Sequence, residues 1–224
     1  MGHRDEDAAG NINLWITDGT SAGTSELTAA GASSGGLSPN DFVGLPTLAG
    51  GPISDFDGDG KFDILFQNST GEADIWDVNG TSVIGGGSIG NSGPRWHVKA
   101  TGDFNGDGHA DVLWQNSSGE VDIWELNGTN IIGSASLGNP GPTWHAFTTG
   151  DFNGDGRSDI LWQNDDGTVA VLPLSRQVRT FNERNDPGSG SSPGNPGPAW
   201  HIKASGDFYS DSIVDLLWQN DDGQ

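Results

Sequence analysis

Two features of the sequence predict an all-β fold built from repeats. An acidic, glycine-rich loop recurs with its first residue at positions 55, 103, 151 and 207. Each copy is followed by a short apolar run: ILFQN, VLWQN, ILWQN or LLWQN. Alternating apolar and polar residues, β-branched side chains and Gly/Asn turns predict strands throughout and no helix. Four strands in a unit of about 48 residues are the pattern of a β-propeller blade.

Four strand segments follow each other within a unit. The run after the loop is the first, and a turn such as SSG or DDG leads to the second, EADIWDVNG or EVDIWELNG. The third is TSVIGGGSIGN or TNIIGSASLGN, and the fourth, RWHVKATGDF or TWHAFTTGDF, leads back to the loop. Because one blade cannot bury both of its faces, we expect Trp114, Trp124 and their equivalents to pack against neighbouring blades.

The two ends of the sequence predict how the repeats close. Residues 7–20, DAAGNINLWITDGT, align with residues 116–129, and residues 216–224, LLWQNDDGQ, reach the same hairpin turn. We therefore expect residues 10–224 to form a single propeller domain of four repeats, with the N- and C-terminal strands sharing one blade. Residues 1–9 are expected to form a flexible tail. In the alternative, the repeats belong to a larger propeller, or two chains form one as a homodimer.

Two insertions interrupt the repeats, over residues 29–46 and 175–198. The first is rich in Gly and Ser and predicts a mobile loop. The second contains three arginines, which predict a local positive patch in an otherwise acidic chain. Just before it, AVLPLSR replaces DIWELNG, and Pro173 cannot donate a hydrogen bond to a sheet. We therefore expect an edge strand there.

Each loop places oxygen atoms at regular positions around a tight turn. In DFNGDGHAD, residues 103–111, side-chain oxygens stand at positions one, three, five and nine, and a backbone carbonyl at position seven. Calcium accepts six to eight such oxygens in irregular geometry, whereas magnesium demands a stricter octahedron. Position twelve is Phe or Trp rather than an acid, so the loop is not an EF-hand. The alternative to a calcium site is a plain acidic turn, and the three near-identical copies favour calcium.

The sequence thus predicts three strong calcium sites and a fourth that is weak or absent. The fourth copy has Tyr209 at position three and lacks both glycines of the turn. The predicted ligands, with position seven contributing its backbone carbonyl, are Asp55, Asp57, Asp59, Lys61 and Asp63; Asp103, Asn105, Asp107, His109 and Asp111; Asp151, Asn153, Asp155, Arg157 and Asp159; and Asp207, Asp211 and Asp215.

The DFNGDG…D…LW pattern resembles the FG-GAP and VCBS repeats of integrin-like propellers and of many bacterial surface proteins. The segment LWITDGTSAGT, residues 14–24, also resembles a repeat of large exported bacterial proteins. The resemblance runs from Gly10 to the C-terminus. It implies loop-bound calcium between the first strands of each blade and a secreted or cell-surface location. Because such propellers usually have seven blades, it also implies the larger ring as an alternative to four blades.

Three repeats carry a Trp-His pair after a Gly-Pro turn. Adjacent strand residues point to opposite faces, so one member of each pair should pack between blades while the other turns away. In a structural interpretation Trp fills the blade interface and His bonds neighbouring backbone. In a functional one the pairs form lectin-like pockets, with Trp stacking on a sugar; a shared transition-metal site is a third possibility. The candidate ligand-binding residues are Trp96, His97, Trp144, His145, Trp200 and His201.

Composition excludes several function classes. The formal net charge of −22 repels phosphate backbones and anionic lipid, so we expect no nucleic-acid partner. No apolar run reaches the length of a membrane span, so we expect no membrane insertion. Cysteine is absent, which excludes disulfides, thiolate metal sites and thiol catalysis.

The sequence contains no nucleophile elbow, Walker loop or zincin motif, and we predict no catalytic residue. The predicted function is that of a calcium-binding propeller module of an exported or cell-surface bacterial protein, mediating adhesion to a glycan or protein. One alternative is an accessory or catalytic propeller of a polysaccharide lyase or hydrolase, with its site on the arginine-containing insertion. Another is calcium-triggered scission at Asp186–Pro187.

Overall fold

The computed structural model describes residues 54–174, 195–206 and 215–223. It also describes the backbone of four short N-terminal strands, β1 (Asp5–Glu6), β2 (Ile12–Asn13), β3 (Trp15–Thr17) and β4 (Thr24–Glu26). These described parts contain strands and turns only, and no helix in them could cross a membrane. The expected all-β fold is confirmed.

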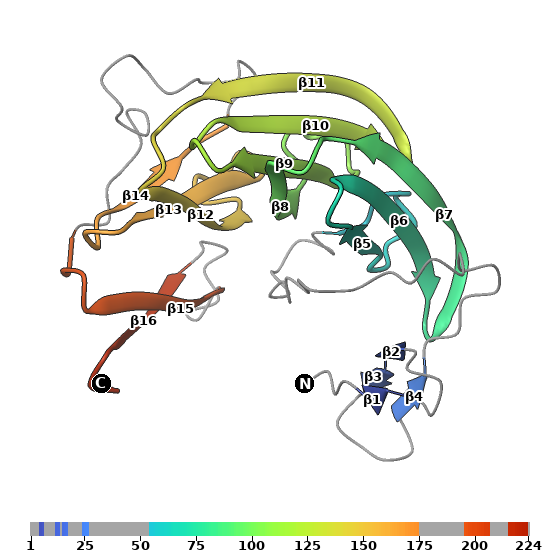
Figure 1. Ribbon diagram of the computed structural model, residues 1–224, viewed down its shortest axis with the longest axis horizontal. Helices are drawn as coiled ribbons and strands as arrows, with labels where there is room; N and C mark the ends of the chain where they lie inside the picture. The colour runs from blue at the N-terminus through green and yellow to red at the C-terminus, as the bar shows by residue number, and fades with distance from the viewer. Residues whose placement is uncertain are drawn as a thin grey trace.

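The remaining strands form four successive antiparallel sheets, each a meander of sequence neighbours. Their bounds are β5 (Ile64–Gln67), β6 (Glu72–Asn79) and β7 (Ser82–Asn91); β8 (Trp96–Gly102), β9 (Asp111–Asn116), β10 (Val121–Asn127) and β11 (Asn130–Gly138); β12 (Trp144–Gly150), β13 (Asp159–Asn164) and β14 (Val169–Leu172); β15 (Trp200–Gly206) and β16 (Asp215–Asn220). The sheets fan out around an open arc, the arrangement of propeller blades (Figure 1).

The Trp-His strand opens a sheet instead of ending one. β8 pairs with β9, from Trp96 opposite Asn116 to Gly102 opposite Asp111. The acidic loop therefore connects the first two strands of a blade, and the expected order of strands within a unit is shifted by one. The physical reason is the loop itself, which reverses the chain so tightly that the strands on either side become antiparallel neighbours.

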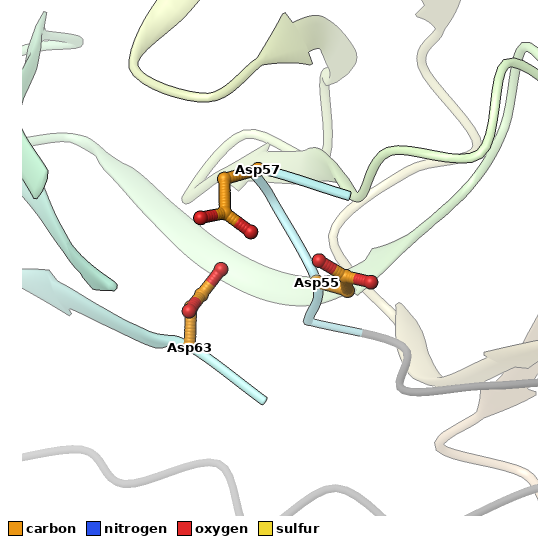
Figure 2. Close-up of side chains that lie close together, drawn as sticks. All are labelled: Asp55, Asp57 and Asp63. Carbon is orange, nitrogen blue, oxygen red and sulfur yellow. The ribbon is translucent and has the colours of Figure 1, made fainter. Parts of the chain in front are cut away.

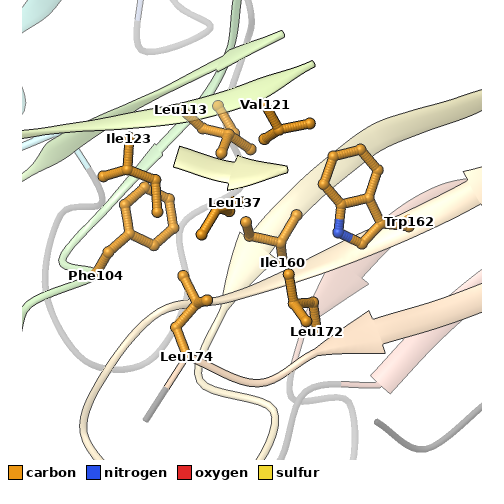
Figure 3. Packing of buried hydrophobic residues seen from close by; sticks show 10 residues of the cluster. Phe104, Leu113, Val121, Ile123, Leu137, Ile160, Trp162, Leu172 and Leu174 are labelled. Carbon is orange, nitrogen blue, oxygen red and sulfur yellow. The ribbon is translucent and has the colours of Figure 1, made fainter. Parts of the chain in front are cut away.

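The core lies between blades. Leu113, Val121 and Ile123 of one sheet pack against Ile160, Trp162 and Leu172 of the next, and all six are buried (Figure 3). The same arrangement recurs one blade earlier, where Trp114, 1% exposed, packs against the first sheet and against Trp124, with ring centroids 4.9 Å apart. The expectation that Trp114 and Trp124 fill a blade interface is confirmed.

A glutamine in each of the first three apolar runs bridges neighbouring blades. Gln67 Nε2 donates to the carbonyl of Trp96 at 2.6 Å, and Gln115 Nε2 to that of Trp144 at 2.7 Å. Gln163 repeats the contact with Trp200 at 3.0 Å. These amides, of which that of Gln115 is buried, join one blade to the first strand of the next.

Ring closure stays a prediction. Among the described strands, β16 pairs only with β15, and β3 pairs only with β4, in separate sheets. Leu217 of β16 is 52% exposed, whereas its equivalents Leu113 and Leu161 are fully buried. In the earlier sheets this leucine is covered by a following blade, whereas in the last sheet Leu217 remains exposed.

The third blade departs from the others where the sequence indicated. β14 ends at Leu172, directly before Pro173, and among the described strands it pairs only with β13, as expected for an edge. The insertion at 29–46, residues 175–194 of the second insertion, and the Asp186–Pro187 bond lie outside the described residues.

Candidate metal-binding loops

The first residue of each of the first three loops organises the turn. Both oxygens of the Asp55 carboxylate accept backbone N–H groups: Gly58 at 2.8 Å and Asp59 at 3.1 Å on Oδ1, and Gly60 at 2.8 Å on Oδ2. Gly58 and Gly60 have φ of 76° and 83°, a left-handed conformation that glycine adopts without strain. The second and third loops, built on Asp103 and Asp151, repeat the pattern.

The ninth residue ties the loop to the blade. Asp63 Oδ2 accepts the N–H of Phe56 at 2.9 Å, and Oδ1 accepts that of Val78, on β6, at 3.1 Å. Asp111 and Asp159 make the equivalent bonds in their loops. All three carboxyl groups are buried, and burial raises the pKa of Asp63 and of Asp159 to about 6 and that of Asp111 to about 7.

The first loop brings three carboxylates together. Oxygens of Asp55, Asp57 and Asp63 all lie within 4.8 Å of one another, and Figure 2 shows the carboxylates of Asp57 and Asp63 facing each other with Asp55 beside them. In the second and third loops the third position is Asn105 or Asn153, which keeps an oxygen there but removes its charge. The first loop is therefore the most acidic of the three at this position.

The side chain at position seven makes a different contact in each of the three loops. In the first loop Lys61 pairs with Asp59, and this ion pair lowers the pKa of the Asp59 carboxyl. In the second loop His109 Nδ1 lies 3.1 Å from the carbonyl oxygen of Phe56, and in the third Arg157 Nη1 donates to that of Phe104 at 3.3 Å. In the second and third loops the side chain at position seven thus reaches back to the preceding loop, whereas the side chain of Lys61 stays within its own loop.

Backbone hydrogen bonds connect consecutive loops directly. The N–H of Ala110 donates to the carbonyl of Asp55 at 2.7 Å, and that of Ser158 to the carbonyl of Asp103 at 2.8 Å. The first three loops therefore form a continuous row along one end of the blades, with each joined to the next.

The same repeat is recognised by comparison with known families. The model of the FG-GAP-like repeat family matches residues 55–114 and again residues 103–162. The chain carries FG-GAP-like repeats. Each match starts at one acidic loop and ends in the strand after the next loop, so the two matches together contain all three intact loops. No curated protein sequence gives a significant match to the chain.

FG-GAP-like repeats are typical of extracellular, adhesion-type propeller modules, and the acidic loops of this chain have the chemistry of a hard-cation site. The donor set consists of oxygen atoms. Asp77 Oδ1, beside the first loop, is buried and has no hydrogen-bond partner among the described residues. Burial raises the pKa of Asp77, and so do the charges of Asp57 and Asp59. Uncompensated negative charge around clustered oxygens fits a calcium ion.

The fourth acidic loop is mostly outside the described residues, including Asp207 and Asp211. Asp215 stands at the start of β16, opposite Gly206, as Asp111 stands at the start of β9 opposite Gly102. The strands on either side of the fourth loop therefore pair in the same register as the strands on either side of the second loop.

The Trp-His pairs lie on the first strands of their blades. Trp96 and Trp144 are partly buried against the inter-blade cores, while His97 and His145 are exposed. Their placement on opposite faces is confirmed, and the ligand-binding role stays a prediction. His145 Nε2 lies 2.8 Å from Asp165 Oδ1, so its partner is a turn carboxylate and not the backbone expected in the structural interpretation.

His201 repeats this contact, with Nε2 2.8 Å from Asp221 Oδ1. The two turns that supply these acids have the sequence NDDG, whereas the corresponding turns of the first two repeats contain Ser and Thr. The sequence signal for the pairing, an acid 20 residues after the histidine, is present only in the last two repeats.

Proposed function

We propose that this chain is a calcium-binding FG-GAP-like propeller module of an exported or cell-surface protein, which displays a rigid surface for adhesion to a glycan or a protein. The observation that carries the proposal is the group of oxygens of Asp55, Asp57 and Asp63 within 4.8 Å of one another. Like charges this close disfavour each other's ionised form, and a divalent cation offsets that cost.

The residues that would hold calcium are the side chains at positions one, three, five and nine of each loop, with the carbonyl at position seven. The ion supplies positive charge and fixes the loop to its blade. The backbone N–H groups that bond the acids at positions one and nine do not use all of the acceptor capacity of these carboxylates. Each ionised carboxylate offers about four lone-pair sites, so some remain to bind a cation. A plain acidic turn explains those N–H bonds equally well, but it gives no reason to gather carboxylates from both ends of the loop.

Adhesion is proposed from the repeat class and from the surface of the blades. The exposed His97 and His145 and the exposed Ile131 and Ile132 of β11 give the module polar and apolar groups on accessible strands. With a net charge of −22, the partner should be neutral or basic, or contact the protein through bound calcium.

The proposal is tested by counting calcium ions. Metal-free protein dialysed against radioactive calcium should take up close to three ions per chain, and Asp57→Ala and Asp107→Ala should each remove one. Binding of none, or no loss in the variants, would contradict it. A glycan array probed with and without calcium then tests adhesion, and a glycan bound only with calcium supports a lectin-like role.

A further inference from the structure

The first strands of the second, third and fourth blades carry the basic side chains of the described sheets. These are His97 and Lys99 on β8, His145 on β12, and His201 and Lys203 on β15. None of the three strands contains an acid, and no other described strand contains Lys, Arg or His. Because His145 and His201 already contact turn acids, the two lysines are the free charges. In a chain with a net charge of −22, these strands therefore carry charge of the opposite sign.

A β-bulge takes one residue of each first strand out of the regular pairing. The register of β8 with β9 shifts between Val98 and Ala100, which leaves Lys99 without a partner residue. The same shift in the third and fourth blades leaves Phe147 and Lys203 without one. Bulges re-aim side chains and are frequent beside functional sites. The equivalent position of three successive blades is thus occupied by Lys, Phe and Lys.

Contacts between blades place these three residues at one level. Thr149 Oγ1 donates to the carbonyl of Thr101 at 2.5 Å, so equivalent residues of β12 and β8 lie side by side. Lys99 and Phe147 each stand two residues before this contact. The glutamine bridge from the third blade to the fourth repeats that from the second to the third, so β15 continues the row and brings Lys203 to the other side of Phe147. Figure 1 shows β8 and β12 toward the inside of the arc and β11 on its outside.

The three side chains are accessible and their charges are unused. Lys203 is exposed, Lys99 is partly exposed, and Phe147 is 37% exposed although its side chain is large and apolar. In the part of the chain that the structure describes, neither of these lysines forms an ion pair, whereas Lys61 pairs with Asp59. Two free ammonium groups on either side of an exposed ring fit a ligand that combines negative charge with a flat apolar face.

We propose that Lys99, Phe147 and Lys203 form a binding site for an acidic oligosaccharide on the inner side of the arc. The lysines pair with carboxylates of the sugar, and the ring of Phe147 stacks on the apolar face of a sugar unit. A uronic acid combines both features in one unit, whereas an acidic peptide offers carboxylates on flexible chains without a ring face. Repetition of the position over three neighbouring strands suits an oligomer better than a single sugar.

This site goes beyond the proposed function and does not rest on it. It uses no residue of the acidic loops and needs no calcium ion as a bridge. The net charge of −22 disfavours an anionic partner over most of the surface, but the inner strands reverse the sign of the charge locally. The acidic sugar and the adhesion partner of the outer surface are therefore separate ligands.

The test is calorimetric titration of the whole chain, in buffer containing calcium, with a tetramer of galacturonic acid. Lys99→Gln and Lys203→Gln should each weaken binding about fivefold, the size of a partly screened ion pair, and Lys99→Arg should retain it. Asn130→Asp, on the outermost strand of the second blade, changes the net charge by the same amount and should leave binding unchanged. Phe147→Leu keeps apolar bulk without a flat ring and should also weaken binding about fivefold.

Two control ligands, a neutral galactose tetramer and an oligoglutamate of equal charge, should both bind more weakly than the acidic tetramer. A protein that takes up calcium but does not bind the acidic tetramer would overturn this site and leave the proposed function standing. If both lysine variants bind as tightly as Asn130→Asp, the sugar binds elsewhere, for example on loop-bound calcium, and the site is overturned. Equal binding of the galactose tetramer would overturn the role of charge, and tighter binding of oligoglutamate would replace the sugar with an acidic peptide.

Discussion

The ninth-position aspartates hold the structure together as well as completing the predicted site. Asp111 is fully buried and accepts N–H groups from Phe104, in the loop, and from Leu126, on β10. Asp107, at position five, is exposed and bonds only within its own loop. Two acids of one motif should therefore contribute differently to stability, because Asp111 joins the loop to β10 and Asp107 does not.

Asp111→Ala should destabilise the protein even when no calcium is present. It leaves two buried N–H donors unpaired, each costing about 1–3 kcal/mol, so we expect a loss of about 2–6 kcal/mol in urea unfolding of metal-free protein. Asp107→Ala should cost little under those conditions. Equal losses in the two variants would contradict the distinction.

The raised pKa values of these buried acids predict an unusual pH dependence. Because the pKa of Asp63, Asp111 and Asp159 is raised to about 6, 7 and 6 in the folded chain, the folded state binds more protons than the unfolded state between about pH 4 and pH 7. The metal-free protein should therefore lose stability as the pH rises through this window.

The stabilisation by calcium should show the opposite trend, since the ion competes with protons for the same oxygens. Thermal melts at pH 5 and pH 7.5, in calcium-free buffer and in calcium, measure both effects. Asp111→Asn should flatten the metal-free trend. A metal-free melting temperature that rises with pH would contradict this explanation.

At the scale of elements, the inter-blade glutamines show how the blades are fastened. Gln115→Ala removes the amide that donates to Trp144 across the interface at 2.7 Å and leaves that carbonyl without this donor. We expect a loss of about 1–3 kcal/mol in unfolding free energy. Ser117→Ala, on the exposed turn beside it, is the control and should change stability by less than about 0.5 kcal/mol. A Gln115→Ala protein as stable as the control would show that the bridge contributes nothing.

The sequence allowed the strands and the loops to be predicted, because alternation and glycine positions are local signals. It did not allow the strands to be assigned to the correct sheets, since the pairing of the Trp-His strand depends on contacts across the loop. Gln67, Gln115 and Gln163 were missed although the glutamine recurs in every apolar run, a repetition that could have identified them.

At the scale of the whole molecule, the open question is what completes the last sheet. By the register of β9 and β10, where Leu113 lies opposite Ile123, the repeat alignment places Leu14 opposite Leu217 in a closed ring. The chain has no cysteine, so a cysteine pair introduced at these two positions gives an unambiguous cross-link.

We expect the Leu14→Cys, Leu217→Cys protein to form an intramolecular disulfide under mild oxidation, as in a ring of four blades. Pairing Leu14→Cys with Ser117→Cys is the control and should give none, because Ser117 lies on an exposed turn of the second blade. A covalent dimer would indicate that two chains complete the propeller. Absence of any cross-link would contradict closure by these strands.

The proposed calcium ions would link all of these scales, because each ion would join a loop to its blade and, through the loop-to-loop hydrogen bonds, to its neighbours. A ligand that binds only the folded state stabilises it by about 2.7 kcal/mol per site at a hundredfold excess over its Kd. The most direct measurement is therefore the thermal unfolding of the intact chain after removal of calcium with EGTA and after calcium is restored. We predict a large fall in Tm on removal and full recovery with calcium but not with an equal concentration of magnesium. A Tm that is the same in EGTA and in calcium would contradict the proposed calcium-binding function.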